Sequence, residues 1–326
     1  MKHQSDHKDS YIEKTVHQLD IDKISTVDDL ALQWSESAVF SGGQLGKIID
    51  IMYHARKNSA KFFVGLAGAM IPGGMRKAIV NAIQNEWIHV LTTTGANITH
   101  DLIETFGGGH IRNIDIHTDA ELRKKGIDRV YNSYVKQGSF ELFEEKIKSL
   151  LSDIFTELNK NNQLIITPSD LLYEIGSRID DENSIVRQAF LKNVRIYVPA
   201  ISDSVLGLQL WLFSQFNNII IDTISDLEKI QTYFYENKTR CAVLFGGGVP
   251  KNYTLQAALM ASTHYQYAVQ ITMDRVETGG LSGASLSEAI SWGKLEDNAI
   301  KATAICDITI ALPIILSALQ QRLKKN

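Results

Sequence analysis

The chain has 326 residues, of which 44% are hydrophobic and 21% are charged, so it can bury the core of one large α/β domain or of two average ones. Its formal net charge of -4 argues against a nucleic-acid or anionic-membrane partner that is held by bulk charge. A small cationic ligand needs only local carboxylates and is not excluded.

The cysteines and the apolar stretches narrow the class of protein further. Cys241 and Cys306 lie in apolar runs that are typical of buried strands, and no Cys-x-x-Cys motif indicates a zinc knuckle or a disulfide framework. The chain begins with Met-Lys-His-Gln-Ser-Asp-His-Lys, which lacks the apolar core of a signal peptide. The longest apolar stretch, 308–319, is too short to span a bilayer. We therefore expect a soluble, cytoplasmic protein with no membrane partner and no bound metal.

Residues 1–23 are polar and show no clear period, and we interpret them as an N-terminal arm that precedes one main domain at 24–326. His3, His7 and His17 lie in this arm, but their spacing matches no common metal site. A solvated arm is the simpler interpretation, and docking on a neighbouring subunit stays open.

Apolar segments alternate with helical ones along most of the chain, which is the pattern of βαβ units and of a parallel sheet. The predicted strands are 61–66, 87–91, 194–199, 219–221, 241–245, 267–272 and 299–305. The predicted helices include 45–59 after a loop at Gly42-Gly43, 75–84, 141–158, one that starts at 167–170, and 253–261. We therefore predict a single doubly wound α/β domain with a mostly parallel, Rossmann-like sheet.

Three glycine-containing turns follow predicted strands, where ligands collect in parallel sheets. The turns 67–74 and 92–97 have a plainer interpretation as tight turns. Gly246-Gly247-Gly248 is the better candidate for holding a phosphate, because glycines let backbone N–H groups approach an anion. It lacks the Gly-x-Gly-x-x-Gly fingerprint and no Gly-Lys-Ser/Thr follows, which excludes a P-loop. Spacing alone leaves nucleotide binding open, and Gly107–Gly109 are interpreted as a flexible loop.

The stretch Ser285–Lys294 carries the best candidate for covalent chemistry. Lys294 follows Trp292 and Gly293, and an apolar setting from the tryptophan would lower the pKa of the amine and make it a nucleophile. The plainer alternative is a surface lysine at the end of a helix. Glu288 would lie on another face of a continuous helix, either as an anchor for a ligand ammonium or as a solvated acid.

Residues 287–294, Ser-Glu-Ala-Ile-Ser-Trp-Gly-Lys, resemble the catalytic-lysine motif of the deoxyhypusine synthase family. The triple glycine with Lys251, the Ser202-Asp203 turn and the Thr92–Thr94 turn occur in matching order and spacing, and the resemblance covers roughly residues 40 to 320. It implies the deoxyhypusine synthase fold, with NAD bound at the ends of parallel strands. It also implies a homotetramer whose active sites are shared between subunits.

The resemblance further implies an activity. In this family NAD oxidises spermidine, and the resulting imine passes its aminobutyl group to an active-site lysine, which Lys294 matches. A protein lysine, or in homospermidine synthase a second amine such as putrescine, then accepts the group. The positions that match the family's NAD site are Gly68, Ala69, Met70, Ile71, Pro72, Thr94, Gly95, Ala96, Asp203, Met273, Asp274, Ser282, Asp307 and Ile308.

The positions that match the substrate site depart from the family. Acids are expected where this chain has Leu208, Thr278, Leu281 and His100, a histidine is expected where it has Asn252, and only Glu288 and Trp292 persist. Fewer carboxylates weaken the binding of a trication, because charge-assisted hydrogen bonds are the strong ones. We therefore predict an NAD-dependent aminoalkyl transferase for a polyamine or related amine, with altered substrate recognition.

Two alternatives stay open. One is authentic deoxyhypusine or homospermidine synthesis, with other acids compensating for the missing ones. The other is a catalytically idle NAD-binding protein that senses an amine or serves as a partner subunit.

Overall fold

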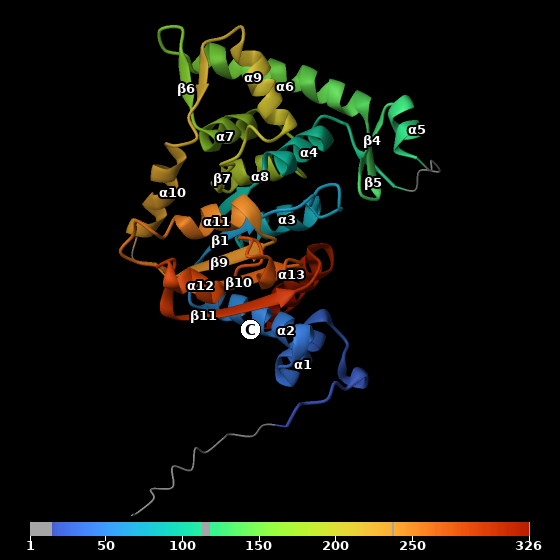
Figure 1. Ribbon diagram of the computed structural model, residues 1–326, viewed down its shortest axis with the longest axis vertical. Helices are drawn as coiled ribbons and strands as arrows, with labels where there is room; N and C mark the ends of the chain where they lie inside the picture. Colours follow the sequence, from blue (N-terminus) through green and yellow to red (C-terminus); the bar gives the residue numbers. More distant parts are fainter. Residues whose placement is uncertain (1–14, 113–117, 237, 326) are drawn as a thin grey trace, which may run out of the picture.

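The structure is a computed structural model that describes residues 15–112, 118–236 and 238–325 (Figure 1). His3 and His7 of the predicted arm lie outside the described residues. Asp20 ties the described part of the arm to the next helix, since its backbone N–H donates to the Gln33 side chain at 2.6 Å. The boundary between arm and main domain stays a prediction.

Six parallel strands form the central sheet, which confirms the predicted α/β fold with a parallel sheet. They are β1 (Lys61–Leu66), β2 (Val90–Thr93), β7 (Arg195–Tyr197), β9 (Arg240–Phe245), β10 (Tyr265–Thr272) and β11 (Leu295–Ile305). Their order across the sheet is β11-β10-β9-β1-β2-β7, and every neighbouring pair is parallel. The chain therefore leaves β1 first toward one edge and later returns through β9 toward the other, which makes the β1–β9 boundary a topological switch point.

Helices cover both faces of this sheet (Figure 1). In the described residues they are α1 (Val27–Ser37), α2 (Phe40–Lys57), α3 (Arg76–Gln84), α4 (Gly95–Thr105), α5 (Asp119–Lys124), α6 (Gln137–Leu158), α7 (Pro168–Arg178), α8 (Ile185–Leu191), α9 (Val205–Ser214), α10 (Asp226–Tyr235), α11 (Gly248–Gln256), α12 (Leu286–Ser291) and α13 (Ile308–Lys325), with short 3-10 turns at Ile21–Lys23 and Val276–Thr278. Over the described part of the chain, none of these helices is both long and apolar enough to cross a bilayer.

Alternate side chains of the central strands enter two separate cores. Phe62 and Val64 belong to the core under α2, α3 and α13, whereas Phe63 packs with α10 and α11 on the opposite face. Successive side chains of a strand point to opposite faces, and here both faces are buried. This explains why the strands occur in the sequence as continuous apolar runs.

Within the described residues, two small sheets lie outside the central one, and one of them corrects the prediction for 219–221. This segment forms β8 (Ile219–Ile221), which pairs with β6 (Leu164–Ile166) and not with the main sheet. The antiparallel strands β3 (His110–Ile111), β4 (Ile127–Val130) and β5 (Ser133–Lys136) form the other small sheet. Strands of two to four residues are too short for periodicity to assign their partners.

The predicted loop at Gly42-Gly43 is wrong, because both glycines lie inside α2. A Cβ atom on Gly43 would lie 2.6 Å from the carbonyl carbon of Ala38, and one on Gly46 would lie 2.4 Å from the backbone nitrogen of Ser35. These glycines therefore serve the close packing of α2 against α1. The helix predicted at 253–261 is also misplaced, since α11 already begins at Gly248 and ends at Gln256.

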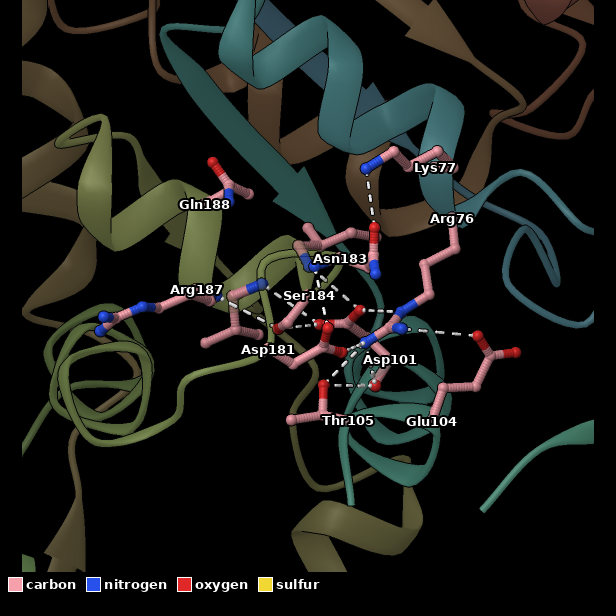
Figure 2. Close-up of polar contacts among 12 residues, drawn as sticks. Arg76, Lys77, Asp101, Glu104, Thr105, Asp181, Asn183, Ser184, Arg187 and Gln188 are labelled. Atoms are coloured by element: carbon pink, nitrogen blue, oxygen red, sulfur yellow. Dashed lines mark hydrogen bonds and ion pairs between the residues drawn. The ribbon is translucent and has the colours of Figure 1, made fainter. Parts of the chain in front are cut away.

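A buried carboxylate joins α3, α4 and α8 (Figure 2). Asp101 of α4 accepts hydrogen bonds from Arg76 Nε at 2.7 Å, from Ser184 Oγ at 2.8 Å, and from the backbone N–H groups of Ile185 and Val186 at 3.0 and 3.1 Å. It thus satisfies N–H groups at the start of α8 that have no partner within the helix. The helix α3 follows β1 and α4 follows β2, so this cluster also holds together the helices that follow these two strands.

Replacing this carboxylate should destabilise the fold. In Asp101→Asn, Arg76 keeps its ion pairs with Asp181 and Glu104 but loses the one with the fully buried Asp101. The donors around residue 101 also lose a charged acceptor, and we expect the free energy of unfolding to fall by about 1.5–3 kcal/mol. Urea denaturation measures it. The matched control is Asp119→Asn, which removes an ion pair with Arg129 that is open to solvent, and should change the midpoint little. Equal losses in the two variants would contradict the role of Asp101.

Candidate functional site

A cleft of about 860 Å³ opens at the carboxyl edge of the central sheet. Segments that follow all six strands line it, including 67–70 after β1 and 246–250 after β9 at the switch point. The tip of the β4–β5 hairpin, 130–133, forms a further wall. Nothing in the sequence pointed to this hairpin, because it carries no motif and lies far along the chain from the other walls.

The cleft brings together most of the residues that match the family's cofactor positions. Those in its lining are Gly68, Ala69, Met70, Pro72, Thr94, Asp203, Met273, Asp274, Ser282, Asp307 and Ile308. Ile71 is buried in the core instead, and Gly95 and Ala96 form the first turn of α4 beside Thr94. The role of each residue toward a cofactor stays a prediction.

Hydrogen bonds between neighbouring turns shape the cleft near β1 and β2. The backbone N–H of Met70 donates to Asn97 Oδ1 at 3.1 Å, and the side-chain Nδ2 of Asn97 donates to Thr93 Oγ1 at 3.1 Å. Thr93 Oγ1 in turn donates to the carbonyl of Leu66 at 2.9 Å. The two turns that the sequence singled out therefore form one bonded unit.

The triple glycine serves close packing more than anion binding. The Gly246 N–H donates to the Ile271 carbonyl at 2.8 Å, and the Gly248 N–H donates to Ser282 Oγ at 2.8 Å. A Cβ atom on Gly247 would lie 2.3 Å from the Cβ atom of Ser282. Because two of the three N–H groups are already bonded, the phosphate cradle predicted here is less open than the sequence suggested.

Lys294 lies between α12 and β11, outside the lining of the cleft. Gly293, at φ 66°, ends the α12 turn, and the Lys294 backbone N–H donates back to the Ala289 carbonyl. The Lys294 Nζ donates to Asn252 Oδ1 at 3.1 Å and lies 5.7 Å from the ring centroid of Trp292. Burial lowers the pKa of Lys294 below its ordinary value of 10.5. The side chain is therefore held in place and is easier to deprotonate than a solvated lysine.

Lys251 is the second lysine of this region, and its surroundings differ. Only 3% of Lys251 is exposed, and this burial lowers the pKa of its amine to about 8. Its Nζ donates to the carbonyls of Leu281, Ser282 and Ala284 at 2.9, 3.4 and 2.6 Å. Since an ammonium has three N–H donors, these carbonyls engage all of them. Geometry therefore favours Lys294 over Lys251 as the nucleophile.

The remaining predicted substrate residues near Lys294 are exposed. Glu288 is exposed and completes a capping box with Ser285 at the start of α12. The helix ends at Ser291, so Glu288 and Lys294 do not lie on one continuous helix. Trp292 is 67% exposed and Leu281 is 43% exposed. In one chain this side of the site is open.

His100 and Leu208 do not join the cleft lining over the described residues. His100 bonds through Nδ1 to His110 at 2.9 Å, and His110 bonds to Glu104 at 2.7 Å. Burial lowers the pKa of His100 to about 4, so it is neutral near pH 7. Leu208 is 55% exposed on α9. The described residues of a single chain do not bring His100 and Leu208 to the cleft, and their roles toward the substrate stay predictions.

Comparison with known proteins agrees with this architecture. Residues 29–319 match the family model of deoxyhypusine synthase. The chain is 42% identical over 303 residues to the protein named "probable deoxyhypusine synthase" of Methanosarcina thermophila, covering 92% of this chain and 93% of that protein. The corresponding protein of Methanothermobacter thermautotrophicus is 37% identical over 303 residues, covering 93% and 96%.

The fold is also similar to a crystal structure from Entamoeba histolytica that is provisionally named a deoxyhypusine synthase. The TM-score is 0.61 at 17% identity, and the match covers 92% of this chain and 95% of that one. At this identity the likeness concerns the fold alone, whereas the family model and the two archaeal relatives concern the sequence. The chain belongs to the deoxyhypusine synthase family.

Proposed function

We propose that this protein is an NAD-dependent aminoalkyl transferase that acts on a polyamine or a related amine through an imine on Lys294. Family membership implies aminobutyl transfer. The single observation that carries the proposal is a half-buried lysine with a lowered pKa, held by Asn252 of α11, the helix whose first residues line the cleft. The imine, the cofactor and the altered choice of amine are the proposed parts.

The cleft fits a dinucleotide cofactor. It lies at the switch point of a parallel sheet, where open α/β folds bind such ligands. Asp203, Asp274 and Asp307 at its rim offer carboxylates to ribose hydroxyls, and Gly68, at φ 86°, lets the backbone come close to a ligand. Bound there, NAD supplies the hydride acceptor for oxidation of the donor amine.

Lys294 performs the transfer step in this proposal. Its neutral amine attacks the imine carbon of the oxidised donor, a new C=N bond to Nζ forms, and the bond to the original nitrogen breaks, which releases the departing amine. Asn252 Oδ1 accepts from Nζ and orients its lone pair. The Trp292 ring lies beside the lysine, with its centroid 5.7 Å from Nζ, and its face attracts a nearby cation.

The residues around Lys294 support an amine that is less cationic than a trication or that differs from it in shape. Leu281 places an apolar side chain where the family has an acid, and Glu288 is the carboxylate that remains at a matching position. An apolar contact favours the methylene chain of an amine but does not pair with an ammonium.

We also infer a homotetramer whose active sites lie at subunit interfaces. Large apolar side chains are exposed on and just after α9, where Leu208, Trp211 and Phe216 are 55%, 58% and 88% exposed. Exposed apolar patches of this kind mark protein–protein contacts. A second subunit that covers Trp292 would close the open side of the site.

Borohydride trapping tests the imine. Wild-type protein with NAD and a panel of amines should give a reduced adduct on Lys294 by mass spectrometry. Lys294→Ala should give no adduct while its NAD affinity stays within about twofold, because Lys294 lies outside the cleft lining. The control Lys47→Ala changes an exposed lysine on α2 and should trap as wild type does.

Two other outcomes of the trapping assay would favour the alternative functions. If no amine labels Lys294 while NAD binds well, the proposal is wrong and an idle, amine-sensing protein takes its place. Robust product from spermidine with a protein acceptor, or from putrescine, identifies an authentic deoxyhypusine or homospermidine synthase.

Asn252→Asp tests the electrostatics of the lysine. A carboxylate in place of the amide stabilises the ammonium form of Lys294 and raises its pKa. Each unit by which the pKa rises lowers the fraction of neutral amine at pH 7 about tenfold, and trapping slows by the same factor. The rate should recover at higher pH. In wild type, the pH profile should level off below pH 10.5, because the pKa of Lys294 is lowered. Identical profiles for variant and wild type would contradict the contact.

A further inference from the structure

A single lysine holds the segment that connects the cleft with the Lys294 side of the site. Lys251 projects from α11, one residue before Asn252, and is 3% exposed. Its ammonium donates to three carbonyls of the segment 281–284. Lysines are seldom buried to this degree, so the contacts must offset a substantial desolvation cost.

The segment 281–284 has parts in both halves of the site. Ser282 lines the cleft, whereas Leu281 is exposed beside it and the following α12 leads to Lys294. Gln270 Nε2 and the Gly248 N–H also bond to this segment, but only at Ser282. The Lys251 ammonium thus adds bonds to the carbonyls on either side of Ser282.

The charges that face Lys251 come from three elements. Glu288 on α12 and Asp274 after β10 attract its ammonium, and Lys294 before β11 repels it. Three carbonyl acceptors favour the charged form of Lys251, whereas Lys294 donates to Asn252. The Lys251 and Lys294 ammonium groups repel each other, and each charge disfavours the protonated form of the other.

We propose that Lys251 is a positioning residue, which holds segment 281–284 against α11 and faces Lys294 with a positive charge at pH 7. The effect on Lys294 rests on the proposed imine function, whereas the effect on the segment does not. Without this ammonium, Leu281 and Ala284 lose their charged donor and the segment loosens. Lys294 also loses a repelling neighbour, so it keeps its proton to higher pH.

Two variants separate charge from shape. Lys251→Met keeps the length of the side chain and removes the ammonium, whereas Lys251→Arg keeps a charge that does not titrate near pH 8. Lys47→Met, on the exposed face of α2, is the matched control. The measurements are amide hydrogen exchange at Gly283 and Ala284, and the pH profile of borohydride trapping on Lys294.

In Lys251→Met we expect exchange at Gly283 and Ala284 to rise about tenfold while the amides of β9 keep wild-type protection. The trapping profile should move to higher pH, with about tenfold slower trapping at pH 7. Lys251→Arg should restore the wild-type trapping rate at pH 7, and Lys47→Met should match wild type in both measurements. A merely structural role would not produce the charge-dependent shift.

Wild-type exchange at Gly283 and Ala284 in Lys251→Met would overturn the positioning role, whether or not any amine reacts. An unshifted trapping profile in that variant would overturn the electrostatic role. If Lys251→Met does not fold, Lys251→Gln takes its place under the same criteria. Absence of any trapped amine in wild type would refute the proposed function, and the exchange result then decides on Lys251 alone.

Discussion

All six strands of the central sheet run in the same direction, so their carboxyl ends meet at one edge. Parallel pairing requires a crossover between consecutive strands, and the helices that supply it cover both faces. The change of direction between β1 and β9 leaves a crevice at this edge, because successive segments diverge to either side there. The Asp101 cluster then ties the helices after β1 and β2 to α8, which fixes the walls of that crevice.

The two halves of the site meet at Ser282. Its hydroxyl bonds to the first residue of α11, and Gly247 approaches it more closely than any side chain would allow. The same segment receives the ammonium of Lys251. The cleft and Lys294 are thus connected through one stretch of backbone, which runs from Ser282 through α12.

The strands of the central sheet and the candidate lysine were predictable from short stretches of sequence. Burial on both faces makes 61–66 and 241–245 continuous apolar runs, and the Ser-Trp-Gly-Lys motif singles out Lys294. The errors have physical causes as well. Gly42 and Gly43 lie in a helix, where the absence of side chains lets α1 pack closely against them. Residues 219–221 pair with β6, and a strand of three residues is too short for its sequence to predict its partner.

The sequence by itself determined the alternation of strands and helices, the family and the identity of the candidate nucleophile, because these depend on local residue patterns and motifs. Only the tertiary structure decided which groups were free to act. It engaged the N–H groups of Gly246 and Gly248, enclosed Lys251 among three carbonyls, and left Lys294 with Asn252. Those outcomes depend on desolvation and on hydrogen-bond partners from segments far apart in the chain, and neither quantity is contained in the local pattern of residues.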